Sequence, residues 1–104
     1  MAQESNNIYF ESLKLHLKYL EDLHKGKLIN IYFVEADLQI TNSLPREING
    51  LTIEYLDKEA IKKKGKQSQF HLIVIKPLEV RNDKIVVNVI DYFVDYSKHN
   101  LNFV

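Results

Sequence analysis

The sequence predicts an α+β domain in which one N-terminal helix packs on a curved antiparallel β-sheet. Apolar residues recur at helical spacing near the start of the chain, and its last third holds two long runs of β-formers joined by a tight turn. A chain of 104 residues has room for one hydrophobic core. We therefore expect a single domain over residues 1–104, and the β-rich end of the chain leaves open that this domain is truncated at its C-terminus.

The predicted helix covers residues 7–25, with Gly26 placed to end it. At ~100° per residue, its apolar side chains gather on one broad face and its charged side chains on the other. A flanking stripe of three apolar residues widens this face beyond what packing on one sheet requires: Ile8, Leu15 and Tyr19.

The middle of the chain predicts shorter strands. Residues 28–34 and 51–56 are rich in β-formers, and the Asn-Gly pair at 49–50 is typical of a two-residue hairpin turn. Residues 37–48 contain turn-forming residues and predict mostly loop, with a short strand left open. One helix followed by an antiparallel meander resembles, in architecture only, the cystatin-like or NTF2-like α+β rolls. No motif of either family carries the resemblance, and a fold analogy does not imply a function.

The C-terminal third predicts the longest hairpin, with strands over residues 69–80 and 84–96 and a turn at 82–83. If pairing continues from the turn without interruption, both faces of the hairpin are mainly apolar. The predicted helix covers one face, so the other is expected to pack against a second copy of the chain. The expected homodimer contacts are Val87, Val89, Phe93, Leu72 and Val74.

Pro77 leaves the register of this hairpin open. Because proline cannot donate to a ladder, a one-residue bulge near it would turn the preceding residues to the opposite face. His71 would then lie opposite Asp95 and on one face with Asp91. This register would create a histidine–carboxylate pair flanked by tyrosines. The candidate ligand-binding residues are accordingly His71, Tyr92, Tyr96 and Asp95. The uninterrupted register is preferred, so no catalytic residue is expected.

A run of lysines follows a short helical turn that starts near Asp57 and is expected to end near Gly65. Lys62, Lys63, Lys64 and Lys66 flank Gly65 and predict a basic loop. The run lacks the P-loop pattern, arginine and stacking aromatics, so a solvated surface is the favoured interpretation over a phosphate grip. The chain has zero formal net charge and only two arginines, which argues against specific nucleic-acid recognition.

The remaining chemistry of the sequence is sparse. The chain has no cysteine, and His16 and His24 are eight positions apart on the helix, too far to share one ion. We therefore expect no metal and no cofactor. No apolar run approaches membrane-spanning length and the first residues lack a signal-peptide pattern, so a cytoplasmic location is expected, with a removed signal peptide left open.

These observations do not identify an activity. The leading hypothesis is a small non-enzymatic interaction or structural module that self-associates. The second is a small-molecule-binding roll or weak enzyme with a pocket between helix and sheet, and the third is a binder of nucleic acid or an acidic partner through the lysine run. A roomy, partly polar pocket would favour the second, and steeply salt-dependent binding the third.

Overall fold

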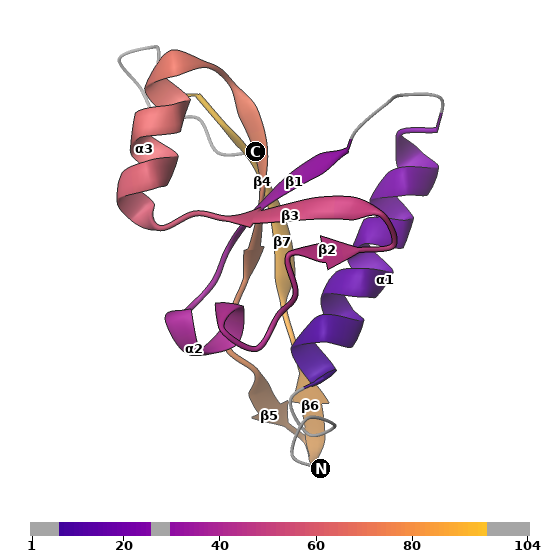
Figure 1. Cartoon of the computed structure of the whole chain (residues 1–104). Coiled ribbons are helices and arrows are strands. Elements are labelled where there is room, and N and C mark those ends of the chain that lie inside the picture. Colours follow the sequence, from indigo (N-terminus) through magenta and orange to yellow (C-terminus); the bar gives the residue numbers. More distant parts are fainter. Residues whose placement is uncertain (1–6, 26–29, 96–104) are drawn as a thin grey trace.

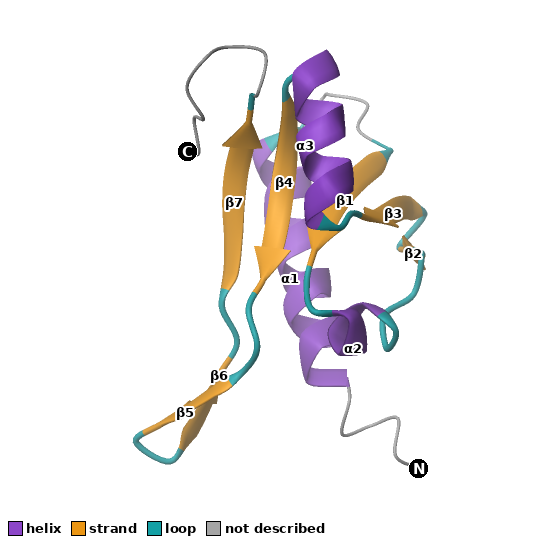
Figure 2. Cartoon of the chain, turned by 90° about the vertical axis from the view of Figure 1, so that its left-hand side faces the viewer, coloured by secondary structure: helices purple, strands orange, loops and turns teal. Residues whose placement is uncertain are grey.

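The computed structural model describes residues 7–25 and 30–95 (Figure 1). Its elements are, in order, α1 (Asn7–Leu23), β1 (Ile31–Glu35), α2 (Leu38–Thr41), β2 (Glu47–Ile48), β3 (Leu51–Tyr55), α3 (Lys58–Gln67), β4 (Phe70–Ile75), β5 (Glu79–Arg81), β6 (Lys84–Val86) and β7 (Val89–Val94). Five strands form one sheet in the order β2-β3-β1-β4-β7. The β5–β6 hairpin projects from the end of this sheet (Figure 2).

The sheet is mixed, so the wholly antiparallel sheet predicted from the sequence is wrong at its centre. β1 pairs in parallel with both β3 and β4, whereas the β2–β3 and β4–β7 pairs are antiparallel as expected. The parallel arrangement requires a crossover connection between β3 and β4. α3 supplies it, because this segment forms a ten-residue helix and not the single turn that the sequence predicted.

Helices cover both faces of the sheet (Figure 2), which differs from a sheet curled around one helix. On the first face α1 buries Leu13, Leu17 and Leu20 against the strands and the segment around α2. On the second face α3 packs Ile61 on Phe70 and other β4 and β7 side chains. β4 is therefore enclosed on both sides, and its nearly continuous apolar sequence is typical of such a strand.

The capping and packing of α3 explain its length. The Asp57 side chain accepts a hydrogen bond from the Ala60 backbone at 2.8 Å, which caps the first turn. Gly65 is buried inside the helix and does not end it. We call the apolar cluster between α3 and the sheet the second core. The Lys64 ammonium lies 4.3 Å from the centre of the Phe33 ring and 5.6 Å from that of Phe70, so this lysine of the run packs on the second core.

Both predicted two-residue turns are confirmed. Asn49 and Gly50 have φ values of 53° and 81°, and they join Ile48 to Leu51. The turn at 82–83 likewise has positive φ at both positions. Asparagine, aspartate and glycine tolerate this backbone region, which explains why the sequence marks these turns clearly.

The register changes by one residue at Pro77. Val80 pairs with Ile85 as the turn dictates, but Ile75 pairs with Val89, so residues 76–78 oppose only residues 87–88. The preferred uninterrupted register is therefore wrong. The bulged alternative is confirmed in placing His71 on one face with Asp91, although Phe93 and not Asp95 lies opposite His71.

This register divides the predicted dimer contacts between the two faces. Leu72 and Val74 are buried beneath α3, whereas Val87 and Val89 pack against the α1 core. Phe93 is 39% exposed on the α1 side of β7. The single apolar face expected for self-association is therefore not formed by these five residues.

The other predicted segments differ less from the structure. α1 ends two residues before the predicted boundary. Residues 37–48, which were expected to be mostly loop with a short strand left open, contain both α2 and the two-residue strand β2. Gly26 and Tyr96 lie outside the described residues.

The Tyr55 hydroxyl ties the end of β3 to the segment before β2, where it donates to the Pro45 carbonyl at 2.6 Å. Burial raises the pKa of Tyr55 from 10.0 to about 12, although Arg46 opposes the shift. Because the pKa is raised in the folded state, the protonated Tyr55 hydroxyl contributes to the free energy of unfolding. This contribution is complete below pH 10 and is lost as the pH rises through about 12. We expect the free energy of unfolding to fall more steeply over this range for the unaltered protein than for Tyr55→Phe, as measured by urea denaturation. Parallel curves for the two proteins would contradict this assignment.

Candidate functional site

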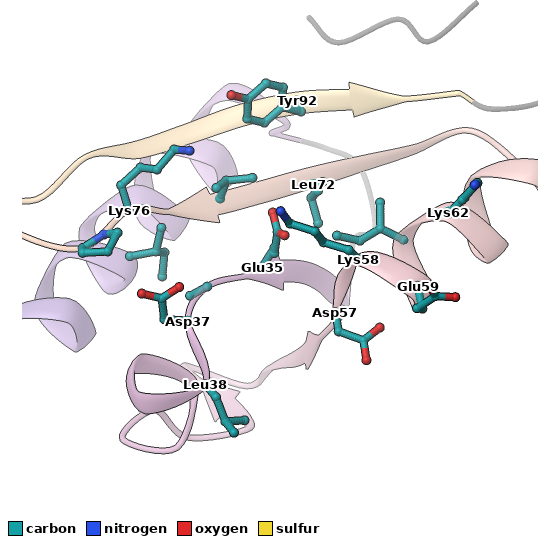
Figure 3. Close-up of a pocket in the computed structure, with 15 residues that line it drawn as sticks. Glu35, Asp37, Leu38, Asp57, Lys58, Glu59, Lys62, Leu72, Lys76 and Tyr92 are labelled. Atoms are coloured by element: carbon teal, nitrogen blue, oxygen red, sulfur yellow. The ribbon is translucent and has the colours of Figure 1, made fainter.

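A cleft of about 860 Å³ opens beyond the carboxyl ends of β1, β3 and β4 (Figure 3). We call it the strand-end cleft. β1 and β4 are neighbours in the sheet. The chain continues from β1 toward the β3 edge of the sheet and from β4 toward the β7 edge, so the two connections diverge between β1 and β4. Ligands of open α/β sheets bind outside the carboxyl ends of the strands at such a point. The volume lies within the range of small-molecule sites.

The floor of the strand-end cleft is apolar and belongs to the second face of the sheet. Leu72 and Val74 come from β4, Ile61 comes from α3, and the half-buried Tyr92 comes from β7. Strand alternation places all three strand residues on the α3 side. The floor can therefore receive the hydrocarbon part of a ligand.

Charged side chains of both signs surround this floor. The basic ones are Lys58 and Lys62, one helical turn apart on α3, and Lys76, which follows β4. Figure 3 shows Lys76 and Tyr92 at one part of the cleft and Lys62 at another. Within residues 7–25 and 30–95, none of the three lysines is held in an ion pair.

The acidic lining residues differ in their availability. Glu35 and Asp37 stand at the end of β1, the first half-buried and the second exposed. Asp57 already caps α3 through its Oδ1 atom. Glu59 of α3 also lines the cleft and is exposed, so Glu35, Asp37 and Glu59 are the carboxylates available to a cationic group, while the lysines can meet an anionic one.

A second polar constellation lies on the opposite face of the sheet. His16 of α1 and His71 of β4 both place Nε2 against the same Oδ1 atom of Asp91 in β7, at 2.8 and 2.9 Å. Because the carboxylate accepts both hydrogen bonds, each imidazole carries a proton on Nε2. This His–Asp–His cluster joins α1 to the two outermost strands on that side and does not line the strand-end cleft.

The histidine–carboxylate pair that the sequence proposed as a ligand site is thus formed with Asp91, and it contacts a helix. No group of three or more His, Cys, Asp or Glu side chains in the described parts of the chain is arranged to hold a metal ion. The geometry supports a stabilising role for the His–Asp–His cluster, because its polar atoms satisfy one another across the α1–sheet contact.

Replacing Asp91 by alanine tests this role. We expect a loss of about 1–2 kcal/mol in the free energy of unfolding, because two partly buried imidazoles lose their shared acceptor. Asp91→Asn keeps an acceptor oxygen and should lose less. Once His16 and His71 are both alanine, Asp91→Ala should cost under about 0.5 kcal/mol in a urea-denaturation cycle. An undiminished cost in that background would refute the role.

The remaining sequence candidates divide between three environments. Tyr92 and Lys62 line the strand-end cleft. Asp95 is buried away from it, with its Oδ2 atom accepting from Gln69 Nε2 at 2.8 Å. The predicted basic loop is helical, and Lys63 and Lys66 are exposed on it outside the cleft lining.

Sequence reasoning missed most of the charged lining. Glu35, Lys58 and Lys76 each stand at or just beyond the carboxyl end of a parallel strand. Polar residues that follow apolar strands are a usable signal only when the strands are known to be parallel and adjacent. The antiparallel prediction therefore concealed their convergence.

No family model, curated protein or solved structure matches the chain. The helices in the described part of the chain include none with the length and apolar character needed to cross a membrane.

Proposed function

We propose that this chain is a non-enzymatic binding module whose strand-end cleft holds a small zwitterionic molecule of the amino-acid type. The observation that carries the proposal is the presence of uncommitted charges of both signs around one apolar floor. Lys58, Lys62 and Lys76 suit a carboxylate, Glu35 and Asp37 suit an ammonium group, and the floor suits an apolar side chain.

The mixed charge selects the ligand class. A simple anion would be attracted by the lysines but repelled by the carboxylates that follow β1. A simple cation would be attracted by those carboxylates but repelled by the lysines. A ligand with both charges can pair with each sign and still bury its hydrocarbon part. The proposed site differs from the pocket expected of a cystatin-like or NTF2-like roll, because it lies at strand ends on the α3 side.

Binding is favoured over catalysis by the chemistry of the lining. The described lining residues include no histidine, serine, threonine or cysteine, so they form no hydroxyl–histidine or thiol–histidine pair of the kind used in nucleophilic catalysis. The His–Asp–His cluster is on the other face of the sheet, where both imidazoles already bond to Asp91.

Isothermal titration calorimetry with three matched probes tests the proposal. L-phenylalanine carries both charges, L-phenylalaninamide only the cation, and N-acetyl-L-phenylalanine only the anion. We expect L-phenylalanine to bind in the millimolar range or tighter, and each single-charge probe to bind about tenfold more weakly through the loss of one charged contact. Equal binding of the three probes, or no heat with L-phenylalanine at millimolar concentration, would show that the cleft is not a zwitterion site.

Variants assign the binding to the strand-end cleft. Lys62→Ala removes a lining lysine and is expected to weaken L-phenylalanine binding about tenfold. Lys63→Ala is the matched control, because its exposed side chain lies one position along α3 and outside the cleft. Equal effects of the two substitutions would point to the general charge of α3 and not to the cleft.

A further inference from the structure

Among the described residues, β7 forms one edge of the sheet, and α1 carries exposed apolar side chains on the helix side that contacts β7. Among the described strands β7 has β4 on one side and no strand on the other. The Lys76 amide donates to the Asn88 carbonyl at 2.9 Å, so even-numbered β7 residues direct their backbone bonds toward β4. Antiparallel ladders alternate, and the N–H and C=O groups of Val89, Asp91 and Phe93 therefore point to the outer edge.

The outer edge of β7 lacks the features that normally keep strands from pairing. The strand contains no lysine, proline or bulge, and its one charge, Asp91, is already bonded to His16 and His71. The other edge of the sheet differs, because β2 is only two residues long. Within residues 7–25 and 30–95, the β7 edge of the sheet is therefore available for strand pairing, whereas the β2 edge offers only two residues.

The side of α1 toward β7 carries exposed apolar residues. His16 reaches Asp91 on β7, and its ring lies 6.0 Å from that of Tyr19. At ~100° per residue, Tyr19 and Leu23 lie further round this same side of the helix. They are 58% and 61% exposed, and Phe93 is 39% exposed on the same side of the sheet.

We propose that two copies of this chain pair through β7, antiparallel about a twofold axis perpendicular to the sheet. The two sheets then form one continuous sheet, and the exposed flanks of the two α1 helices face each other above it. We call this the β7 edge interface. The inference does not rest on ligand binding in the strand-end cleft, although Tyr92 belongs to both surfaces.

The second copy is favoured over an unrelated partner because the surface is complementary to itself. The chain has no net charge, so two copies do not repel each other. From their exposed fractions, Tyr19, Leu23 and Phe93 leave roughly 300 Å² of apolar surface uncovered on this side of each copy. A second copy would cover this apolar surface and pair the outward backbone groups of β7 in one contact.

The side-chain pattern also selects a register. Residues opposite each other must share a face, so the paired numbers are both odd or both even. Centring the axis on Asp91 would oppose two carboxylates. Centring it on Tyr92 instead pairs Tyr92 with the partner's Tyr92, and Asp91 with the partner's Phe93. Position 92 then forms a non-hydrogen-bonded pair, whose Cα atoms stand ~4.5 Å apart.

Sedimentation velocity at micromolar concentration tests the association. The unaltered chain should sediment as a dimer, and Tyr19→Glu and Phe93→Lys should each raise the dissociation constant at least tenfold. Val80→Lys is the control, because Val80 is 69% exposed on the β5–β6 hairpin, outside the interface. Circular dichroism verifies that each variant is folded. A monomeric unaltered chain, or dimers that survive both interface substitutions, would overturn the proposal.

Disulfide trapping tests the register, and the natural absence of cysteine makes a single introduced thiol unambiguous. Tyr92→Cys should form a covalent dimer on mild oxidation, because the proposed Cα separation suits a disulfide. Ile90→Cys is the matched control, because Ile90 would face the partner's Val94. Trapping at position 90 but not at 92 would contradict the proposed pairing.

Discussion

Ile73→Ala is expected to lower the free energy of unfolding by about 3–4 kcal/mol. Ile73 is fully buried in the middle of β4, where its register partners are Val34 of β1 and Asp91 of β7. It belongs to the core beneath α1. Removing its branched side chain leaves a cavity that three strands and a helix cannot easily close, so the cost exceeds that of simple exposure.

Urea denaturation of Ile73→Ala beside Ile85→Ala measures this cost. The same truncation at Ile85, which is 59% exposed on the β5–β6 hairpin, should change the free energy of unfolding by under about 0.5 kcal/mol. Similar losses at the two positions would mean that the α1 core is not where the structure places it.

Phe70→Ala is expected to cost about 3 kcal/mol or more, because it removes the aromatic centre of the second core. The Phe70 ring meets that of Phe33 edge-on, with centroids 5.5 Å apart and planes at 75°. Lys64 of α3 lies over both rings. The substitution therefore loosens the contact between α3 and the face that α1 does not cover.

Thermal and urea unfolding of Phe70→Ala distinguishes a two-sided sheet from a sheet curled around one helix. Val80→Ala serves as the exposed control and should be nearly neutral. A cost below about 1 kcal/mol for Phe70→Ala would indicate an open second face and would contradict the packing of α3.

Local patterns in the sequence predicted the local structure well. The α1 periodicity and the two turns at 49–50 and 82–83 depend on neighbouring residues only, and the structure contains all three. The flanking stripe that seemed excessive for one sheet is explained in part by its exposure, since Leu15 and Tyr19 extend past the core contact.

Non-local pairing could not be predicted in the same way. Whether β1 pairs in parallel with β3 and β4 depends on the crossover through α3, whose lysines and internal Gly65 gave it a weak helical pattern. The one-residue bulge at Pro77 sets the hairpin register, and with it the face on which His71 lies. Either outcome at Pro77 was compatible with the apolar pattern, because both faces of β4 are covered.

The residues of the candidate site could be predicted only in part, because their convergence also depends on how the strands pair. Tyr92 and Lys62 were singled out from the sequence for other reasons, and both line the strand-end cleft. Glu35, Lys58 and Lys76 are far apart in the chain, and only the parallel order of the strands brings them to one sheet end. Their convergence is a property of topology and not of any local motif.

Amide chemical-shift mapping with L-phenylalanine tests the central claim most directly, because it locates the ligand on the unaltered chain. Binding in the strand-end cleft predicts the largest shifts at Lys58, Lys62, Lys76 and Tyr92, with little change at the exposed flank of α1. Shifts centred on His16, His71 and Asp91, or no shifts at saturating ligand, would contradict the account.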